Sequence, residues 1–188
     1  MASQERQGQA MVLMMEAMAA AQFGDYKETV RLLTEALQIV PYNGELYHNR
    51  GMAYGKMQRW REALADFNRA IALDPHPSSY EQRSLVYYHL GDRHAAGQDL
   101  LEVMRIDPQR TFPLMNLGWL CIEDKRYQEA IDYCTRVIGI EPTLAAAYTN
   151  RARAYLEIGD KARAFADLQK AKHLIDNGLD TSGQDLVE

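Results

Sequence analysis

Arginine and aspartate recur in the sequence at a spacing that suits ion pairing. The arginines are Arg50, Arg83 and Arg151, and each stands sixteen residues before one of three aspartates, Asp66, Asp99 and Asp167. An arginine fork can bind an external anion, but a partly buried guanidinium also needs a carboxylate partner within the protein. We therefore expect each arginine to pair with its aspartate and to bridge two helices.

Side chains suited to metal binding or nucleophilic catalysis are sparse. His89, Asp92 and His94 flank an expected turn, so their side chains lack the same-face geometry of metal ligands. Cys121 and Cys134 have no metal-ligand spacing and occupy positions typical of a core, where a thiol is inert. No Ser/His/Asp motif or phosphate-binding loop stands out. We therefore expect no catalytic residue, no metal and no cofactor, and a protein that is not an enzyme.

A row of side-chain amides recurs at nearly the same interval. The amide row comprises Asn49, Gln82, Asn116 and Asn150, and Met15 holds the equivalent position nearer the N-terminus. A carboxamide both donates and accepts, so amides at this spacing could bond successive peptide groups of an extended chain. The alternative is that they bond only to neighbouring helices. The sequence leaves both interpretations open.

Apolar and aromatic side chains flank the amide row. The candidates for peptide binding are, besides the four amides and Met15, the residues Met18, His48, Met52, Leu85, Tyr88, Phe112, Met115 and Trp119. Methionines and aromatics on an open surface suit the anchoring of a partner's apolar side chains. Apolar residues at helical spacing are also typical of a core, so Met11, Met14 and Trp119 could instead pack between repeated units.

All these positions belong to one repeated pattern. Its clearest copy, residues 45–75, carries an aromatic residue, a small residue, an aromatic residue, alanine, phenylalanine, alanine and proline, namely Tyr47, Gly51, Tyr54, Ala63, Phe67, Ala70 and Pro75. Prolines at 41, 75, 108 and 142 mark steps of 34, 33 and 34 residues. A period of this length indicates stacked helical hairpins.

The pattern resembles the tetratricopeptide repeat. The resemblance implies an all-α fold: an α-solenoid, wound as a right-handed superhelix, of five antiparallel helix-turn-helix units, whose first helices line a concave groove. The expected units are about 10–43, 44–76, 77–110, 111–144 and 145–176, between a flexible N-terminus at 1–9 and a polar C-terminal tail at 177–188. The amide row is similar to the asparagine ladder in the repeat domain of O-linked N-acetylglucosamine transferases.

Three glycine–aspartate pairs mark turns inside the expected hairpins. They are Gly24-Asp25, Gly91-Asp92 and Gly159-Asp160. Glycine can take the left-handed conformation that ends one helix, and aspartate is a favoured N-cap of the next. Each pair therefore predicts the turn between two helices.

Composition limits the classes of partner. The chain has 188 residues, of which 47% are hydrophobic and 25% charged, with a formal net charge of −5. An acidic chain does not suit broad binding to nucleic acid or anionic membrane. Residues 10–21 resemble a signal peptide loosely, but Glu16 interrupts their apolar run and no run is long enough to span a membrane. With only two cysteines, a cytoplasmic location is the expectation.

The leading functional hypothesis is a non-enzymatic protein-interaction module or scaffold that holds an extended peptide in a groove. The alternative is a cytosolic client chaperone or adaptor that masks a secreted or assembling partner. The family's carboxylate clamp for the C-termini of Hsp70 and Hsp90 is not matched, because Met14, Met18, Ser78 and Gln82 stand where its other residues are expected around Asn49. Self-association through the last helix, by Leu168, Leu174 and Ile175, is a third hypothesis.

Overall fold

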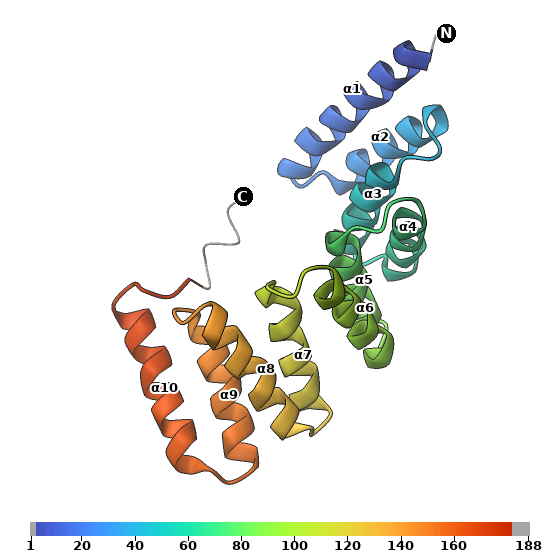
Figure 1. Cartoon of the computed structure of the whole chain (residues 1–188). Helices are drawn as coiled ribbons and strands as arrows, with labels where there is room; N and C mark the ends of the chain where they lie inside the picture. Colours follow the sequence, from blue (N-terminus) through green and yellow to red (C-terminus); the bar gives the residue numbers. More distant parts are fainter. Residues whose placement is uncertain (1–2, 182–188) are drawn as a thin grey trace. The chain divides into compact units, whose positions relative to one another are not determined.

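The structure, a computed structural model, describes residues 3–181 and contains ten α-helices within that range (Figure 1). The helices are α1 (Ser3–Gln22), α2 (Tyr26–Ile39), α3 (Gly44–Lys56), α4 (Trp60–Leu73), α5 (Pro77–His89), α6 (Arg93–Ile106), α7 (Thr111–Glu123), α8 (Tyr127–Ile140), α9 (Ala145–Glu157) and α10 (Lys161–Asp176). The described residues form no β-strand. The all-α fold predicted from the repeat spacing is confirmed.

The chain divides into two compact units, residues 1–103 and 104–188. In unit 1, α1 packs on α2 and α3 on α4, while α2 also packs on α3 and α4 on α5. In unit 2, α7 packs on α8 and α9 on α10, while α8 packs on α9. Each unit therefore contains hairpins joined by one recurring kind of contact, in which the second helix of one hairpin packs on the first helix of the next.

Small residues allow the two helices of a hairpin to approach closely. At Gly51 a Cβ atom would lie 3.1 Å from the ring of Phe67, and at Gly118 it would lie 3.3 Å from the Cys134 sulfur. Phe67 is buried with Ala63 and Val86 between α3, α4 and α5. The bulk of Phe67 therefore favours glycine at position 51.

Both cysteines lie in the core of unit 2. Cys121 and Cys134 are free thiols and are buried. Burial raises the pKa of both, that of Cys134 to about 12, so the nucleophilic thiolate is scarce at neutral pH. The prediction that they are buried core residues is confirmed.

The turns inside the hairpins follow the glycine–aspartate prediction. Gly24, Gly91 and Gly159 have φ values of 76°, 85° and 83°. The aspartate after each accepts a hydrogen bond from a backbone N–H of the following helix, at 3.0, 2.9 and 3.0 Å for Asp25, Asp92 and Asp160. The other two turns place non-glycine residues in the left-handed region, Gln58 at φ 57° and Lys125 at φ 60°.

Both ends of the described chain contain ordered contacts outside the expected repeats. Residues 3–9 fall in the range expected to be flexible, yet α1 begins at Ser3 and includes them. Their glutamine, glutamate and arginine residues are good helix formers, and no proline interrupts them. Beyond α10, the Asp180 carboxylate accepts from the Ala145 N–H at 2.9 Å and so bonds the start of α9. Residues 182–188 of the predicted tail lie outside the described residues.

Candidate functional site

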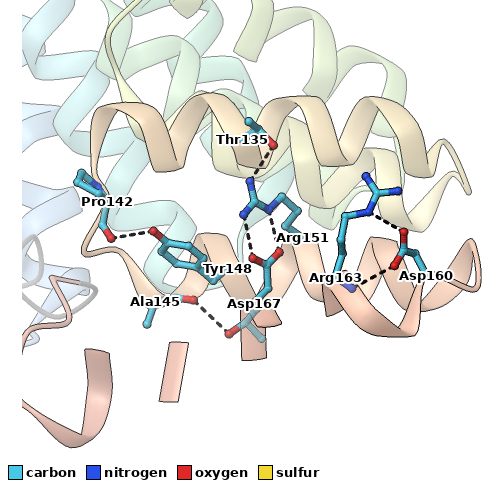
Figure 2. A network of polar contacts seen from close by, with 9 residues as sticks. Thr135, Pro142, Ala145, Tyr148, Arg151, Asp160, Arg163 and Asp167 are labelled. Carbon is cyan, nitrogen blue, oxygen red and sulfur yellow. Dashed lines mark hydrogen bonds and ion pairs between the residues drawn. The ribbon is translucent and has the colours of Figure 1, made fainter. Parts of the chain in front are cut away.

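The three arginines pair with the aspartates sixteen residues later. Arg50 donates from Nε and Nη2 to the two carboxylate oxygens of Asp66, both at 2.8 Å. The same bidentate hydrogen bonding joins Arg83 to Asp99 and Arg151 to Asp167. Figure 2 shows the Arg151–Asp167 pair between α9 and α10. The predicted bridging of two helices is confirmed.

Each of these arginines also reaches the preceding hairpin. Its Nη1 donates to an oxygen on the second helix of that hairpin: Thr34 for Arg50, Asn68 for Arg83 and Thr135 for Arg151. Two tyrosine rings of its own helix lie within 6.0 Å of each guanidinium. The hydrogen bond to aspartate is the largest influence that raises the pKa of each arginine. All three guanidinium groups donate to side chains within the protein, so they do not form a site for an external anion.

The candidate metal ligands at the α5–α6 turn do not converge. The His89 ring stacks on Trp60 with centroids 4.1 Å apart, while His94 bonds to Gln98 at 3.0 Å. Among residues 3–181, no group of three or more histidine, cysteine, aspartate or glutamate side chains is arranged to hold a metal ion.

Unit 1 carries two adjoining grooves beside α3. The large groove has a volume of about 1000 Å³, and its lining includes Arg6, Met11, Met14, Ile39, Tyr42 and Asn43. The small groove has a volume of about 340 Å³, and its lining includes His48, Asn49, His76, Ser78 and Ser79. Gly44, Glu45 and Asp74 line both grooves. The two spaces therefore meet where α3 begins and α4 ends.

His48 contacts both a polar and an aromatic neighbour in the small groove. Its Nδ1 lies 2.9 Å from the Ser79 hydroxyl oxygen, and its ring contacts Phe67 edge-on with centroids 5.6 Å apart. Burial, with a smaller contribution from the charge of His76, lowers the pKa of His48. The neutral imidazole therefore predominates at neutral pH.

The candidate peptide-binding residues of unit 1 differ in accessibility. His48 and Asn49 line the small groove. Met15, Met18 and Met52 are exposed on α1 and α3 but line neither groove. The remaining candidates of unit 1 are partly buried on α5, namely Gln82, Leu85 and Tyr88.

The candidates of unit 2 lie on α7 and α9. Phe112 is exposed, whereas Met115 packs against the core residues Leu114, Val137 and Ala147. The Asn116 amide donates to the Phe112 carbonyl at 2.9 Å, within its own helix. Trp119 and Asn150 are partly buried. Among the four amide side chains of the row, only that of Asn116 forms a hydrogen bond to a described residue. This bond does not reach a neighbouring helix. A ligand role for these residues stays a prediction.

The repeat pattern does not predict several groove residues, because they lie between helices or at helix ends. Tyr42, Asn43 and Asp74 belong to links between hairpins, and Arg6 lies in the part of α1 that precedes the first expected repeat. The repeat pattern describes helix faces, so it carries little information on link residues. The proline before Tyr42, at the end of the repeat, is the one signal that marks this region.

Hairpins tied by bidentate arginine–aspartate pairs and stacked through one recurring contact define a helical-repeat protein. The chain belongs to the tetratricopeptide-repeat family: models of the tetratricopeptide repeat match residues 44–77, 77–110, 113–144 and 145–174. The first hairpin lies outside these matches.

Comparisons with known proteins agree with this assignment. Over 86 residues, covering 45% of the chain, the sequence is 36% identical to mouse sperm-associated antigen 1, of which it spans 9%. The fold is similar to MamA of Desulfovibrio magneticus RS-1, with a TM-score of 0.84 at 16% identity over 90% of this chain and 96% of that one. It is also similar to YrrB, described as a TPR protein with an unusual peptide-binding site, with a TM-score of 0.76 at 18% identity over 94% and 92% of the two chains.

Among the described residues, no helix is both long enough and apolar enough to cross a membrane.

Proposed function

We propose that unit 1 binds an extended peptide segment of a partner protein in its two adjoining grooves. Tetratricopeptide-repeat proteins bind protein or peptide partners, and the family assignment makes this chain an interaction module. The proposal of a peptide site in unit 1 rests on one observation: the two grooves meet at Glu45 and Asp74. The large groove has apolar side chains in its lining, and the small groove has an amide.

The dimensions of the grooves support a peptide ligand. Ligand sites have volumes of roughly 300 to 1,000 Å³, and the two grooves fall at the two ends of that range. Their shared lining at Gly44 and Glu45 lets one segment occupy both. A peptide in this path would pass from α1 along the start of α3 toward the start of α5.

The lining supports a division of roles between the grooves. Met11, Met14 and Ile39 give the large groove apolar walls, and methionine adapts to side chains of different shapes. The side chain of Asn49 in the small groove makes no hydrogen bond to another described residue, so its carboxamide can donate to and accept from a peptide backbone. The ligand's apolar side chains therefore occupy the large groove, and its backbone meets Asn49.

The charges where the grooves meet favour a basic ligand. The carboxylates of Glu45 and Asp74 line both spaces. Arg6 and His76 stand in separate grooves. The preferred segment therefore combines apolar residues with lysine or arginine, which is the opposite of an acidic C-terminal tail.

Fluorescence anisotropy with two labelled peptides tests the proposal. In one peptide leucine alternates with lysine, and in the other leucine alternates with glutamate. We expect the lysine peptide to bind with a Kd on the order of micromolar and the glutamate peptide at least about tenfold more weakly. Equal binding of the two peptides would contradict the charge assignment.

Two variants locate the binding in unit 1. Asn49→Ala and Met11→Ala remove groove-lining groups and should each weaken the lysine peptide by about tenfold, which corresponds to one lost hydrogen bond or anchor. Asn116→Ala is the matched control, because that amide holds the equivalent position but bonds within its own helix. A loss of affinity in the control that equals the loss in Asn49→Ala would exclude unit 1 as the binding site.

A client chaperone is a second candidate, favoured by one observation. Met11, Met15 and Met18 are all more than half exposed along α1. A flexible apolar surface of this kind suits partners of varied sequence. Co-expression distinguishes the two functions: a chaperone keeps its client soluble, whereas an interaction module joins partners that are soluble alone.

A further inference from the structure

Two helix faces of the described chain expose side chains, Val12 and Ala19 on α1 and Leu168 on α10, whose equivalents in the other hairpins are buried. The outer face of α1 consists of Val12, Glu16 and Ala19, and the outer face of α10 consists of Phe165, Leu168 and Gln169. We propose that these faces bind each other between two copies of the chain, so that α1 of one copy packs on α10 of the next. This self-association goes beyond the proposed peptide binding.

The outer face of α1 corresponds to the surface that packs on a preceding hairpin. Val12 is 54% exposed, whereas its equivalents Leu46, Ser79 and Ala147 are at most 3% exposed. Ala19 is exposed as well, whereas its equivalents are buried, namely Ala53, Val86 and Ala154. In α1 two side chains at packing positions are therefore exposed to solvent.

The outer face of α10 corresponds to the surface that receives a following hairpin. Leu168 is 42% exposed, although its equivalents Leu33, Phe67 and Cys134 are at most 1% exposed. Phe165 is 62% exposed, whereas its equivalent Ile131 is buried against α9 and the other equivalents, Val30, Leu64 and Gly97, are partly buried. The chain therefore carries both halves of its own recurring contact, one on α1 and the other on α10.

The contacts inside each unit indicate how the two faces meet. In unit 2, Ile131 of α8 packs in one cluster with Ala154 of α9. In unit 1, Leu64 of α4 packs with Val86 of α5. If the two copies pair their helices in the same way, Phe165 of one copy meets Ala19 of the next. A large side chain then lies against a small one, which allows close packing of the helices.

The polar residues on the two outer faces differ from their equivalents inside the units, and the two differences are complementary. At the contacts inside the units, an arginine of the first helix donates to an oxygen on the preceding second helix, as Arg50 does to Thr34 and Arg151 to Thr135. The equivalents on the outer faces are Glu16 and Gln169. The Gln169 amide can donate to the Glu16 carboxylate, so donor and acceptor exchange sides and the contact stays paired.

The surrounding charge favours the same partner. Lys170 is exposed on α10, and Lys172 beside it pairs with Asp176 at 2.8 Å, whereas Glu16 is the acidic residue of the α1 face. Because the two faces differ, the contact is heterologous: each copy keeps one face free, and association continues into longer chains or a closed ring.

Sedimentation velocity of the 188-residue chain over a wide range of concentration tests the proposal. We expect the average mass to rise above the 21.4 kDa of one copy as concentration increases. Phe165→Glu and Val12→Glu should each hold the chain at the mass of one copy, with unchanged helical content because both side chains are exposed. A wild-type chain that stays at 21.4 kDa throughout would overturn the proposal.

A mixing experiment distinguishes this contact from a symmetric one. The Val12→Glu chain keeps an intact α10 face and the Phe165→Glu chain keeps an intact α1 face, so an equal mixture should form pairs that grow no further. Two other results would also contradict the proposal. In one, Val12→Glu alone still associates, which indicates a contact of α10 with itself. In the other, the mixture remains monomeric.

Discussion

Arg50 and Asp66 meet through two parallel hydrogen bonds of 2.8 Å, and both side chains are largely buried. The same guanidinium donates to Thr34 on the preceding hairpin. One side chain therefore joins three helices, α2, α3 and α4. We therefore expect Arg50 to determine stability rather than ligand binding.

Arg50→Ala should lower the free energy of unfolding by about 3 to 5 kcal/mol, because it leaves the buried Asp66 carboxylate without its partner. Chemical denaturation measures the loss. The double variant Arg50→Leu/Asp66→Tyr should recover most of it, since Leu117 and Tyr133 hold these positions in the fourth repeat.

Arg31→Ala is the control, because Arg31 pairs with Glu28 and Glu35 at the surface and its removal should leave the melting temperature near wild type. A fully stable Arg50→Ala protein would show that the pair is dispensable.

Gly51→Ala should destabilise the chain by about 1 to 3 kcal/mol, because the added Cβ would lie 3.1 Å from the Phe67 ring. Adding Phe67→Leu should restore stability, since alanine and leucine occur together at the equivalent positions, Ala17 with Leu33 and Ala152 with Leu168. Gly139→Ala is the matched control: nothing lies within 4 Å of its Cβ, and helix propensity alone should add up to about 1 kcal/mol. Thermal unfolding of the three variants separates packing from propensity, and failure of Phe67→Leu to compensate would refute the packing explanation.

Lys125→Gly should stabilise unit 2 by up to about 1 kcal/mol, because Lys125 has φ 60° and glycine relieves the cost of the left-handed conformation. Gly159→Ala places a Cβ at φ 83° in the equivalent turn and should destabilise by a similar amount. Differential scanning calorimetry can compare the pair. Melting temperatures that shift in the same direction would indicate that the turn conformation does not govern either effect.

Stability should decrease as the pH falls below the ordinary histidine pKa near 6.5, in part because of His48. Burial lowers the pKa of His48 in the folded chain, so the unfolded chain binds the proton more readily. The contribution is complete above the unfolded pKa and is lost as the pH drops through it toward the folded value. Urea denaturation at several pH values should show a smaller decrease for His48→Gln, which keeps a polar group near Ser79. The same substitution at the exposed His94 is the control, and an unchanged pH profile in His48→Gln would exclude this residue as the cause.

The sequence predicted the features that follow from spacing and residue type. The proline interval gave the hairpins, and the sixteen-residue separation gave the ion pairs. Glycine followed by aspartate identified three of the five turns inside the hairpins. Each of these features depends on residue type and spacing along the chain and not on how neighbouring hairpins stack.

Features that depend on neighbouring hairpins were not predictable in this way. The third hydrogen bond of Arg50, to Thr34, requires knowledge of how two hairpins stack. The Asp180 carboxylate bonds the start of α9 from 35 residues away, outside any repeat position. The grooves are built partly from links such as Tyr42 and Asn43, whose conformations the repeat pattern does not specify.

The position of Arg50 and Arg151 midway between their partners bears on how the chain folds. Arg50 is sixteen residues from Thr34 and sixteen from Asp66, and Arg151 is sixteen from both Thr135 and Asp167. Closing the loop toward either side therefore has nearly the same entropic cost. Folding that starts at an arginine-bearing hairpin can extend toward either terminus with little kinetic preference, and the short sequence separation of these contacts favours rapid refolding.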